Sequence, residues 1–175
     1  MHEYLSIREL NQEDVTQSYV NWLNDPGTNM YLESRFQTHT MESVKAFVRD
    51  MLESKENILF GVYHGEKHVG NIKIGSIHDF HKHADVGLII GKEYWGKGFA
   101  TEAIGLVSEV AFRQLKLHKL YAGAYSCNKK SISAFLKNGW KIAGEQKEHC
   151  MVNGQYADCV LLEIIDRDYF RNVKE

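Results

Sequence analysis

The chain has 175 residues, a hydrophobic content of 43% and a formal net charge of −2. This length corresponds to about one domain, spanning residues 1–175, and the apolar content is enough for a sizeable core. The slight negative charge argues against a nucleic-acid partner held by bulk electrostatics, because such proteins usually carry an excess of Lys and Arg.

The sequence also argues against a membrane partner. No stretch approaches the roughly 18 consecutive apolar residues of a membrane span. The polar segment at residues 1–8 lacks the apolar core of a secretion signal. We therefore expect a cytoplasmic protein.

Cysteines and histidines give no strong indication of a metal site. The three cysteines are Cys127, Cys150 and Cys159. An odd number at wide spacing favours reduced thiols over a disulfide framework or a zinc site. Three histidines and an aspartate fall within residues 78–83, but metal ligands need convergent geometry and this run occupies a polar turn. We expect a solvated loop and no metal.

The first third of the chain predicts a strand and two helices. Residues 4–8 alternate between apolar and polar side chains, as a strand does. A helix is predicted to start at residues 11–14, and the Asn-Asp-Pro-Gly turn at residues 24–27 ends it. A second helix is predicted at residues 41–52, with Thr40 as its N-cap.

The remaining elements are strands and helices in mixed order. They are expected at residues 58–63, 69–74 and 84–91 (strands), 101–115 (helix), 120–125 (strand), 132–138 (helix), and 146–152 and 157–165 (strands). The Asn153-Gly154 pair between the last two strands is a strong signal for a tight hairpin. The order β, α, α, β, β, β, α, β, α, β, β predicts a mixed α/β fold.

The most informative segment is residues 85–105, where an apolar strand breaks into a glycine-containing loop that opens directly into a helix. Gly96 and Gly98 remove side chains where a ligand would approach the backbone. Exposed N–H groups and the positive end of the helix dipole favour a bound anion. The loop lacks both the glycine spacing of a dinucleotide fingerprint and the Gly-Lys-Ser/Thr ending of a P-loop. It predicts a pyrophosphate cradle of another kind.

Two motifs carry a resemblance to a known family. From Trp95 the hexapeptide Trp-Gly-Lys-Gly-Phe-Ala fits the pattern Gln/Arg-x-x-Gly-x-Gly/Ala, except at its first position. The chain therefore resembles the GNAT acyl-CoA N-acyltransferases, and residues 94–103 are similar to the RimJ/RimL-type branch. Residues 119–140 resemble the fifth strand of that family, its Asn-x-x-Ser turn and a helix that ends in Lys-x-Gly-aromatic.

The resemblance implies a fold, a cofactor and the residues that hold it. The fold would be a mixed α/β GNAT fold with a central, mostly antiparallel, twisted sheet and helices on both faces. The cofactor would be acetyl-CoA, and the protein a monomer or homodimer. The cofactor-binding residues would be Leu88, Ile89, Ile90, Trp95, Gly96, Lys97, Gly98, Phe99, Ala100, Thr101, Asn128, Ser131 and Phe135.

Acyl transfer to an amine needs a positioned thioester, a neutral amine and donors for the developing oxyanion. The leaving thiol has a pKa of about 8.5 to 9, so a general acid is useful without being indispensable. Many family members place a tyrosine at the position of Phe135, which cannot donate a proton. Ser126, Ser131, Tyr125 or water could substitute. Cys127 lacks an identifiable His and acid partner, which disfavours a covalent acyl-cysteine step.

Two acids are candidates for the base that removes a proton from the acceptor ammonium. Asp85 begins the central strand, where similar enzymes often carry an acid, and Glu33 lies in the loop between the first helices. The ordinary alternative for Asp85 is a strand-end acid in a salt bridge. For Glu33 it is a solvated loop residue.

Residues 31–36 combine two aromatic side chains, an acid and an arginine, as a polar substrate pocket requires. This segment resembles one in GNAT enzymes that acetylate amino groups on nucleotide-linked sugars. Arg35 could meet a phosphate or carboxylate, or form a surface ion pair. The expected substrate-binding residues are Tyr31, Glu33, Arg35, Phe36 and Tyr125.

The resulting prediction is an acetyl-CoA-dependent N-acetyltransferase that acts on a primary amine by direct attack in a ternary complex. Its acceptor is expected to be a small amino metabolite, such as a nucleotide-linked amino sugar, in preference to the N-terminus of a ribosomal or other protein. A rival of another class is a non-catalytic acyl-CoA sensor or interaction module.

Overall fold

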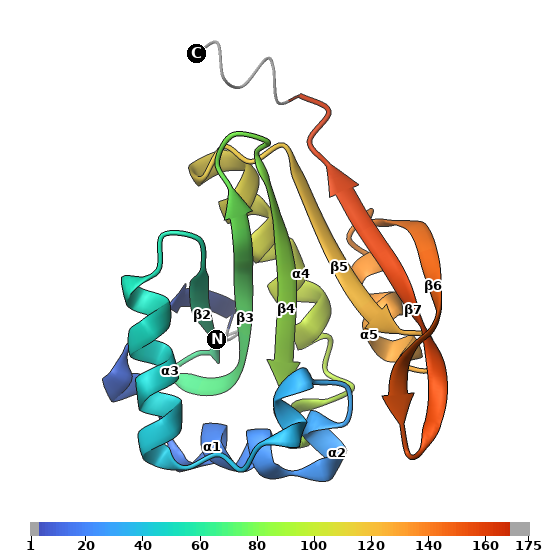
Figure 1. Ribbon diagram of the computed structural model, residues 1–175. Coiled ribbons are helices and arrows are strands. Elements are labelled where there is room, and N and C mark those ends of the chain that lie inside the picture. Colours follow the sequence, from blue (N-terminus) through green and yellow to red (C-terminus); the bar gives the residue numbers. More distant parts are fainter. Residues whose placement is uncertain (1–3, 169–175) are drawn as a thin grey trace.

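One seven-stranded sheet organises the computed structural model, which describes residues 4–168 (Figure 1). The strand order is β1-β2-β3-β4-β5-β7-β6. The strands are β1 (Leu5–Glu9), β2 (Ile58–His64), β3 (Lys67–His78), β4 (His83–Ile90), β5 (Lys119–Tyr125), β6 (Lys141–Val152) and β7 (Gln155–Ile165). Only the β4–β5 pair is parallel, and the other recorded pairs are antiparallel. The predicted mixed α/β fold with a mostly antiparallel sheet is confirmed.

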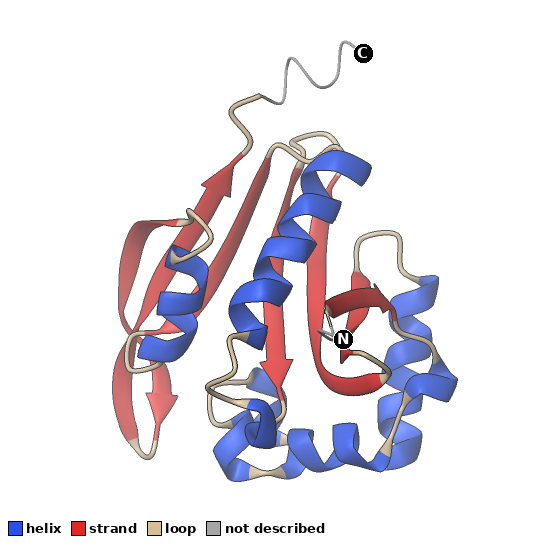
Figure 2. Cartoon of the chain, turned by 180° about the vertical axis from the view of Figure 1, so that it is seen from behind, coloured by secondary structure: helices blue, strands red, loops and turns tan. Residues whose placement is uncertain are grey.

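Helices lie on both faces of this sheet. The helices are α1 (Gln17–Asn24), α2 (Pro26–Asn29), α3 (Met41–Glu53), α4 (Phe99–Glu109) and α5 (Lys129–Leu136), with the shorter turns η1 (Gln12–Asp14), η2 (Glu33–Phe36) and η3 (Lys92–Tyr94) and the π-helical segment η4 (Val110–Gln114). Helices α4 and α5 cover one face (Figure 2), and α3 packs at β2 on the other (Figure 1). The buried core between these layers includes fully enclosed aliphatic side chains such as Ile72, Ile104 and Leu120.

The first helix begins later than the sequence predicts. Asn11 caps only the short turn η1, and Val15 then returns to extended backbone. Thr16 provides a second cap, its side chain accepting from the Tyr19 N–H, and α1 begins after it. Two capping residues in succession therefore divide the predicted helix into a turn and a helix.

Other predicted boundaries shift by a few residues. Helix α4 begins at Phe99 and continues after Glu109 as η4, and α5 begins directly after its cap, Asn128. Asn153 and Gly154 have φ values of 51° and 78°, which confirms the tight turn between β6 and β7. Helix α3 and its Thr40 cap lie where the sequence predicts them.

Strands β4 and β5 pair over a short stretch only. In the described chain their ladder joins His83–Asp85 to Lys119–Tyr121 and ends there. Each strand then continues along its antiparallel neighbour, β4 with β3 as far as Ile90 and β5 with β7 as far as Tyr125. The two strands diverge toward α1 and α2 (Figure 1), so the sheet opens into a V.

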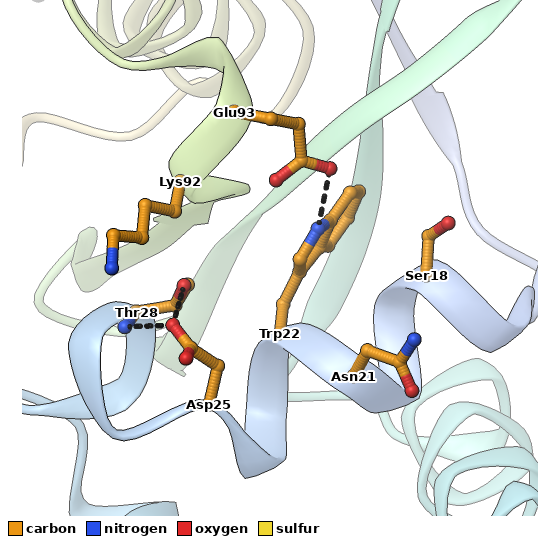
Figure 3. Close-up of a pocket in the computed structure, with 7 residues that line it drawn as sticks. All are labelled: Ser18, Asn21, Trp22, Asp25, Thr28, Lys92 and Glu93. Atoms are coloured by element: carbon orange, nitrogen blue, oxygen red, sulfur yellow. Dashed lines mark hydrogen bonds between the residues drawn. The ribbon is translucent and has the colours of Figure 1, made fainter.

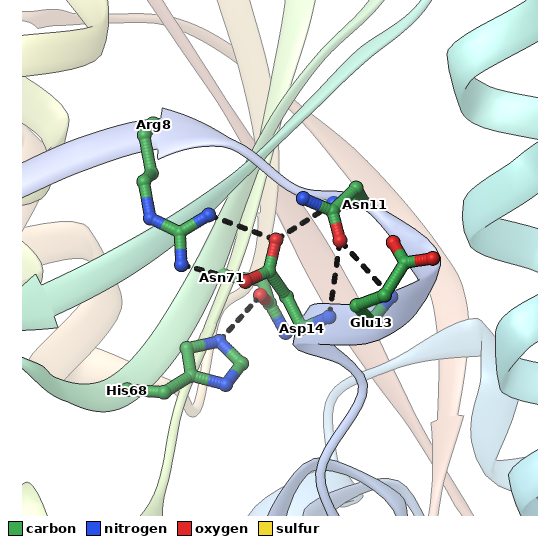
Figure 4. A network of polar contacts seen from close by, with 6 residues as sticks. All are labelled: Arg8, Asn11, Glu13, Asp14, His68 and Asn71. Atoms are coloured by element: carbon green, nitrogen blue, oxygen red, sulfur yellow. Dashed lines mark hydrogen bonds and ion pairs between the residues drawn. The ribbon is translucent and has the colours of Figure 1, made fainter.

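A polar network fastens η1 to β1 (Figure 4). The two guanidinium nitrogens of Arg8 donate to the Asp14 carboxylate at 2.6 and 2.8 Å, and the Asn11 N–H donates to the same carboxylate at 2.9 Å. The Arg8 guanidinium holds the pKa of the Asp14 carboxyl below its usual value of 3.8. Asp14 therefore stabilises the fold in its charged form.

Replacing Asp14 with Asn should give a pH-dependent loss of stability. Because the folded-state pKa is lowered, the contribution is present above about pH 4 and is lost as the pH falls through the folded pKa. We expect Asp14→Asn to lower the free energy of unfolding by about 1 kcal/mol at pH 7, since Arg8 is half exposed. Urea unfolding at several pH values measures this, with Asp50→Asn in an exposed pair as control. A loss that does not shrink below pH 4 contradicts the assignment.

Candidate active site

The glycine loop lies directly after β4 and η3, at the start of α4. Gly96 and Gly98 have φ values of 78° and 84°, in the left-handed region that favours glycine, and a Cβ at either would meet nothing within 4 Å. In the described chain no side chain caps α4 at Gly98. The first-turn amides, beginning at Phe99, Ala100 and Thr101, are therefore not claimed by a capping side chain. An open glycine face and these amides fit a pyrophosphate.

Two aromatic side chains fix the start of the loop. The Trp95 indole nitrogen donates to the Ile90 carbonyl at 2.8 Å, so the residue that departs from the family pattern ties the loop to the end of β4. The Lys130 ammonium lies 5.2 Å from the Trp95 ring centroid, and the Lys97 ammonium lies 5.4 Å from that of Tyr94. Both cations lie beside the loop, where they would favour a bound anion.

Strand β4 presents an open edge inside the V. Beyond Asp85 its described residues have no recorded partner on the β5 side. Leu88 and Ile89 are half-buried along this stretch, and Ile90 is buried. Gly87 is exposed, and a Cβ there would meet nothing within 4 Å. Backbone groups along this edge can pair with an extended ligand such as a pantetheine arm.

The Asn-x-x-Ser turn and the helix after it have mainly structural contacts. The Asn128 side chain accepts from the Ser131 N–H at 3.3 Å and caps α5. Phe135, expected near the cofactor, is only 2% exposed, and its ring packs against Trp140 with a centroid separation of 4.7 Å. Phe135 thus packs in the core beside Trp140, and its expected place near the cofactor remains a prediction.

The predicted acceptor loop meets the end of β5. The Tyr125 hydroxyl donates to Glu33 Oε1 and accepts from Arg35 Nη1 at 2.9 Å. The Tyr31 and Tyr125 rings meet edge to face, with centroids 5.6 Å apart. Phe36 is 70% exposed and lies under the Arg35 guanidinium. All five predicted substrate residues (Tyr31, Glu33, Arg35, Phe36 and Tyr125) are thus brought together into one acceptor cluster.

Arg35 is occupied by acceptors from the protein itself. Besides Tyr125, Nη1 donates to the Leu32 carbonyl at 2.8 Å, and Nη2 donates to the Met151 carbonyl at 2.8 Å. Its side chain is 14% exposed, and its distance to Glu33 Oε1 is 3.9 Å. The ordinary ion-pair alternative is therefore present, and Arg35 also joins η2 to β5 and to the β6–β7 hairpin. A role for Arg35 in binding an anionic group of the substrate remains a prediction.

Sequence reasoning missed the contribution of Met151. The hairpin turn at Asn153-Gly154 is the signal that could have indicated it, because the turn returns β7 along β6 and fixes the register of the hairpin. Which carbonyl faces Arg35 depends on that register.

Burial and hydrogen bonding keep Tyr125 neutral. Burial raises the pKa of the Tyr125 hydroxyl to about 12, and the hydrogen bond to Glu33 adds to this effect. The hydroxyl is therefore protonated near neutral pH and serves as a donor to Glu33. A phenol with such a high pKa is a weak proton donor to a thiolate, which makes Tyr125 a poor substitute for the missing family tyrosine.

The other catalytic candidates lie along the V. Asp85 Oδ2 is 3.6 Å from Lys73 Nζ, and its backbone is the last of β4 to pair with β5. The ordinary salt-bridge alternative is thus present, and a catalytic role for Asp85 remains a hypothesis. Ser126 is half-buried directly after β5, and its backbone N–H donates to the backbone carbonyl of Asp158 at 2.8 Å. Ser131 is half-buried in the first turn of α5.

The histidine turn does not form a metal site in the described residues. The rings of His78, His81 and His83 have centroid separations of 4.5 to 6.0 Å, but no group of three potential ligands between residues 4 and 168 is arranged to hold a metal ion. All three cysteines are free thiols, as predicted. No helix in residues 4–168 is long and apolar enough to cross a membrane.

Comparison with known proteins identifies the family. A family model described as an acetyltransferase (GNAT) domain matches residues 5–141. The chain belongs to the GNAT acetyltransferase family. It is 28% identical to the spermidine N(1)-acetyltransferase of Escherichia coli over 172 residues, which cover 97% of this chain and 90% of the relative. It is 30% identical over 123 residues to the probable N-acetyltransferase YjcK of Bacillus subtilis, covering 69% and 68% of the two chains.

Solved structures agree on the GNAT fold. A spermidine N-acetyltransferase from Vibrio cholerae in complex with CoA and spermine superposes with a TM-score of 0.85 at 24% identity, over 95% of this chain and 98% of the other. RimL, a ribosomal-protein acetyltransferase in complex with coenzyme A, gives a TM-score of 0.82 at 15% identity, over 92% and 93% of the chains. At these identities the likeness concerns the fold.

This GNAT protein is an acetyl-CoA-dependent N-acetyltransferase. The expectation of acetyl-CoA as cofactor is confirmed at the family level, and the glycine loop and the open β4 edge have the shape that this cofactor requires. The narrower assignment to the RimJ/RimL branch is not shown. A curated relative that aligns over nearly the whole chain is a spermidine N(1)-acetyltransferase, and the likeness to RimL concerns the fold alone.

The glycine loop gives a direct test of cofactor binding. Valine at Gly98 would strain a φ of 84° and place a side chain on the open face of the loop. We expect Gly98→Val to raise the Kd for acetyl-CoA by about tenfold or more in titration calorimetry. Gly154→Val, at a φ of 78° with equally open surroundings in the β6–β7 turn, should leave this Kd unchanged. Equal affinities for the two variants would remove Gly98 from the cofactor site.

Proposed function

We propose that this enzyme acetylates a primary amino group of a polyamine of the spermidine type. Curated relatives that align over nearly the whole chain carry the name spermidine N(1)-acetyltransferase. The proposed acceptor is thus a small, multiply charged cation. Transfer is proposed to occur by direct attack in a ternary complex.

The charge of the acceptor cluster is the observation that carries this proposal. The Glu33 side chain is 79% exposed, while Arg35, the nearest cation, is 14% exposed and engaged by three protein oxygens. Arg35 keeps its positive charge 3.9 Å from Glu33 but is largely covered, so the charge that the cluster presents to solvent is the Glu33 carboxylate. A carboxylate that is held by Tyr125 and accessible to solvent is suited to a substrate ammonium.

The same charge distribution argues against a nucleotide-linked amino sugar. Its phosphates would need an accessible cation, and the Arg35 side chain is 14% exposed and already donates to Leu32, Tyr125 and Met151. Glu33 would repel those phosphates. The N-terminus of a ribosomal or other protein is a second candidate, and the likeness to RimL that favours it concerns the fold alone.

Roles for the remaining site residues follow from the chemistry of amide formation. Acetyl-CoA supplies an activated acetyl thioester. We assign to Glu33 the binding of a substrate ammonium and to Asp85, directly or through water, the removal of a proton from the attacking amine. Ser126 and Ser131 are candidates for hydrogen bonds to the oxyanion or to the departing thiolate.

A panel of amines tests the acceptor. Release of free thiol from acetyl-CoA should be measured with spermidine, spermine, a nucleotide-linked amino sugar and a peptide with a free N-terminus. We expect kcat/KM for spermidine to exceed the values for the sugar and the peptide by at least about tenfold, because only the polyamine carries a second ammonium for Glu33. Faster turnover of the sugar or the peptide would overturn the proposal.

A charge-neutral variant tests Glu33 itself. Glu33→Gln keeps an acceptor for Tyr125 but loses the negative charge, so KM for spermidine should rise on the order of tenfold while the Kd for acetyl-CoA stays unchanged. Glu66→Gln, in the exposed turn between β2 and β3, is a matched control with no expected effect. An unchanged KM for Glu33→Gln would exclude the proposed ammonium contact.

A further inference from the structure

Helix α1 holds the segment that leads into the glycine loop (Figure 3). The Trp22 indole nitrogen donates to Glu93 Oε1 at 3.0 Å across 71 residues of sequence. Trp22 is 4% exposed, whereas Glu93 lies on the exposed side of η3. This hydrogen bond connects the helical layer before the acceptor loop to the turn that immediately precedes Trp95.

The same indole touches the residues on both sides of Lys92. A Cβ at Gly91 would lie 2.5 Å from the Trp22 ring, so the ring lies directly on the backbone where β4 ends. The Tyr94 ring meets Trp22 nearly perpendicularly, with centroids 6.2 Å apart. Gly91, Glu93 and Tyr94 are therefore all positioned by one buried side chain.

A second contact holds Lys92, which lies between Gly91 and Glu93. Lys92 Nζ lies 2.9 Å from the position that a Cβ of Gly27 would occupy, so the ammonium group rests on the start of α2. The pocket between these elements has a volume of about 480 Å³, and Trp22, Asp25, Lys92 and Glu93 are among its lining residues (Figure 3). Contacts with α1 and α2 thus hold all of η3, from Lys92 to Tyr94.

The glycine loop has few contacts beyond the Trp95 indole bond to the Ile90 carbonyl and the contacts of Lys97 and Lys130 with aromatic rings. Residues 95–98 are all exposed, and two of them are glycines with positive φ, which have wide conformational freedom. Ordering such a loop around a ligand costs conformational entropy unless its ends are already fixed. Helix α4 fixes one end, and η3 fixes the other.

We propose that Trp22 and Glu93 form a positioning pair that holds η3 and so preorganises the glycine loop for acetyl-CoA. The pair acts through the backbone of Gly91 to Trp95. This role concerns the cofactor, so it does not depend on the identity of the acceptor amine.

Removal of the Glu93 carboxylate tests the pair without disturbing the core. The full chain carrying Glu93→Ala should bind CoA on the order of tenfold more weakly in titration calorimetry, whereas Glu93→Gln, which keeps an acceptor oxygen for the indole, should stay within about twofold of wild type. Glu109→Ala, an exposed residue at the end of α4, is the control and should not change the Kd. No acceptor amine is present, so failure of the polyamine proposal cannot affect the result.

Hydrogen exchange of the ligand-free protein separates positioning from general stability. In Glu93→Ala the amides of Tyr94 and Trp95, which donate to the Gly91 and Lys92 carbonyls, should exchange faster than in wild type, while those of β2 and β3 and the Tm should be unchanged. Trp22→Phe should weaken CoA binding to a similar degree, and adding Glu93→Ala to it should weaken binding no further.

The proposal is overturned if Glu93→Ala binds CoA like wild type, if Glu93→Gln is as impaired as Glu93→Ala, or if the losses of the two single variants add. A uniform fall in Tm and in amide protection across the sheet, without a selective change at the Tyr94 and Trp95 amides, also overturns it, because that result describes a purely structural contact.

Discussion

Strands β4 and β5 share only three residue pairs, and the candidate site lies around the point where this pairing ends. Each strand keeps an antiparallel neighbour beyond that point, so each has its backbone groups satisfied on one side. On the sides that face the V, backbone N–H and C=O groups are available to a ligand. The glycine loop lies at the far end of β4, and the acceptor cluster lies at the far end of β5. One interrupted ladder therefore provides an extended binding edge and separates donor and acceptor groups across it.

Charge distribution differs between the two ends of the V. Around the glycine loop, Lys97 and Lys130 lie over aromatic rings beside helix amides that favour an anion. In the acceptor cluster Arg35 donates to protein oxygens and is largely covered, and Glu33 is the exposed charge. An anionic donor and a cationic acceptor would thus each meet charges of the opposite sign. Arg35 has a structural task here, because its planar group joins three segments that are distant in sequence.

The helices before β2 take part in both halves of the site. The segment from α1 through η2 positions Glu33 against Tyr125, and its first helix places Trp22 under η3. A displacement of this segment would therefore reach the acceptor cluster and the cofactor loop together. On the proposed role of Trp22 and Glu93, contacts of this kind preorganise the loop for its ligand.

Local conformation was readable from the sequence. The Thr40 cap begins α3 where the sequence predicts it, and the Asn153-Gly154 pair adopts the positive φ values of the predicted tight turn. Such preferences act over a few residues and indicated the order of the elements. Two short motifs indicated the family. Only the tertiary structure decided that Arg35 faces Met151 and that Trp22 meets Glu93, pairs separated by 116 and 71 residues. Those contacts depend on sheet register and on how helices pack across the V, which no local pattern specifies.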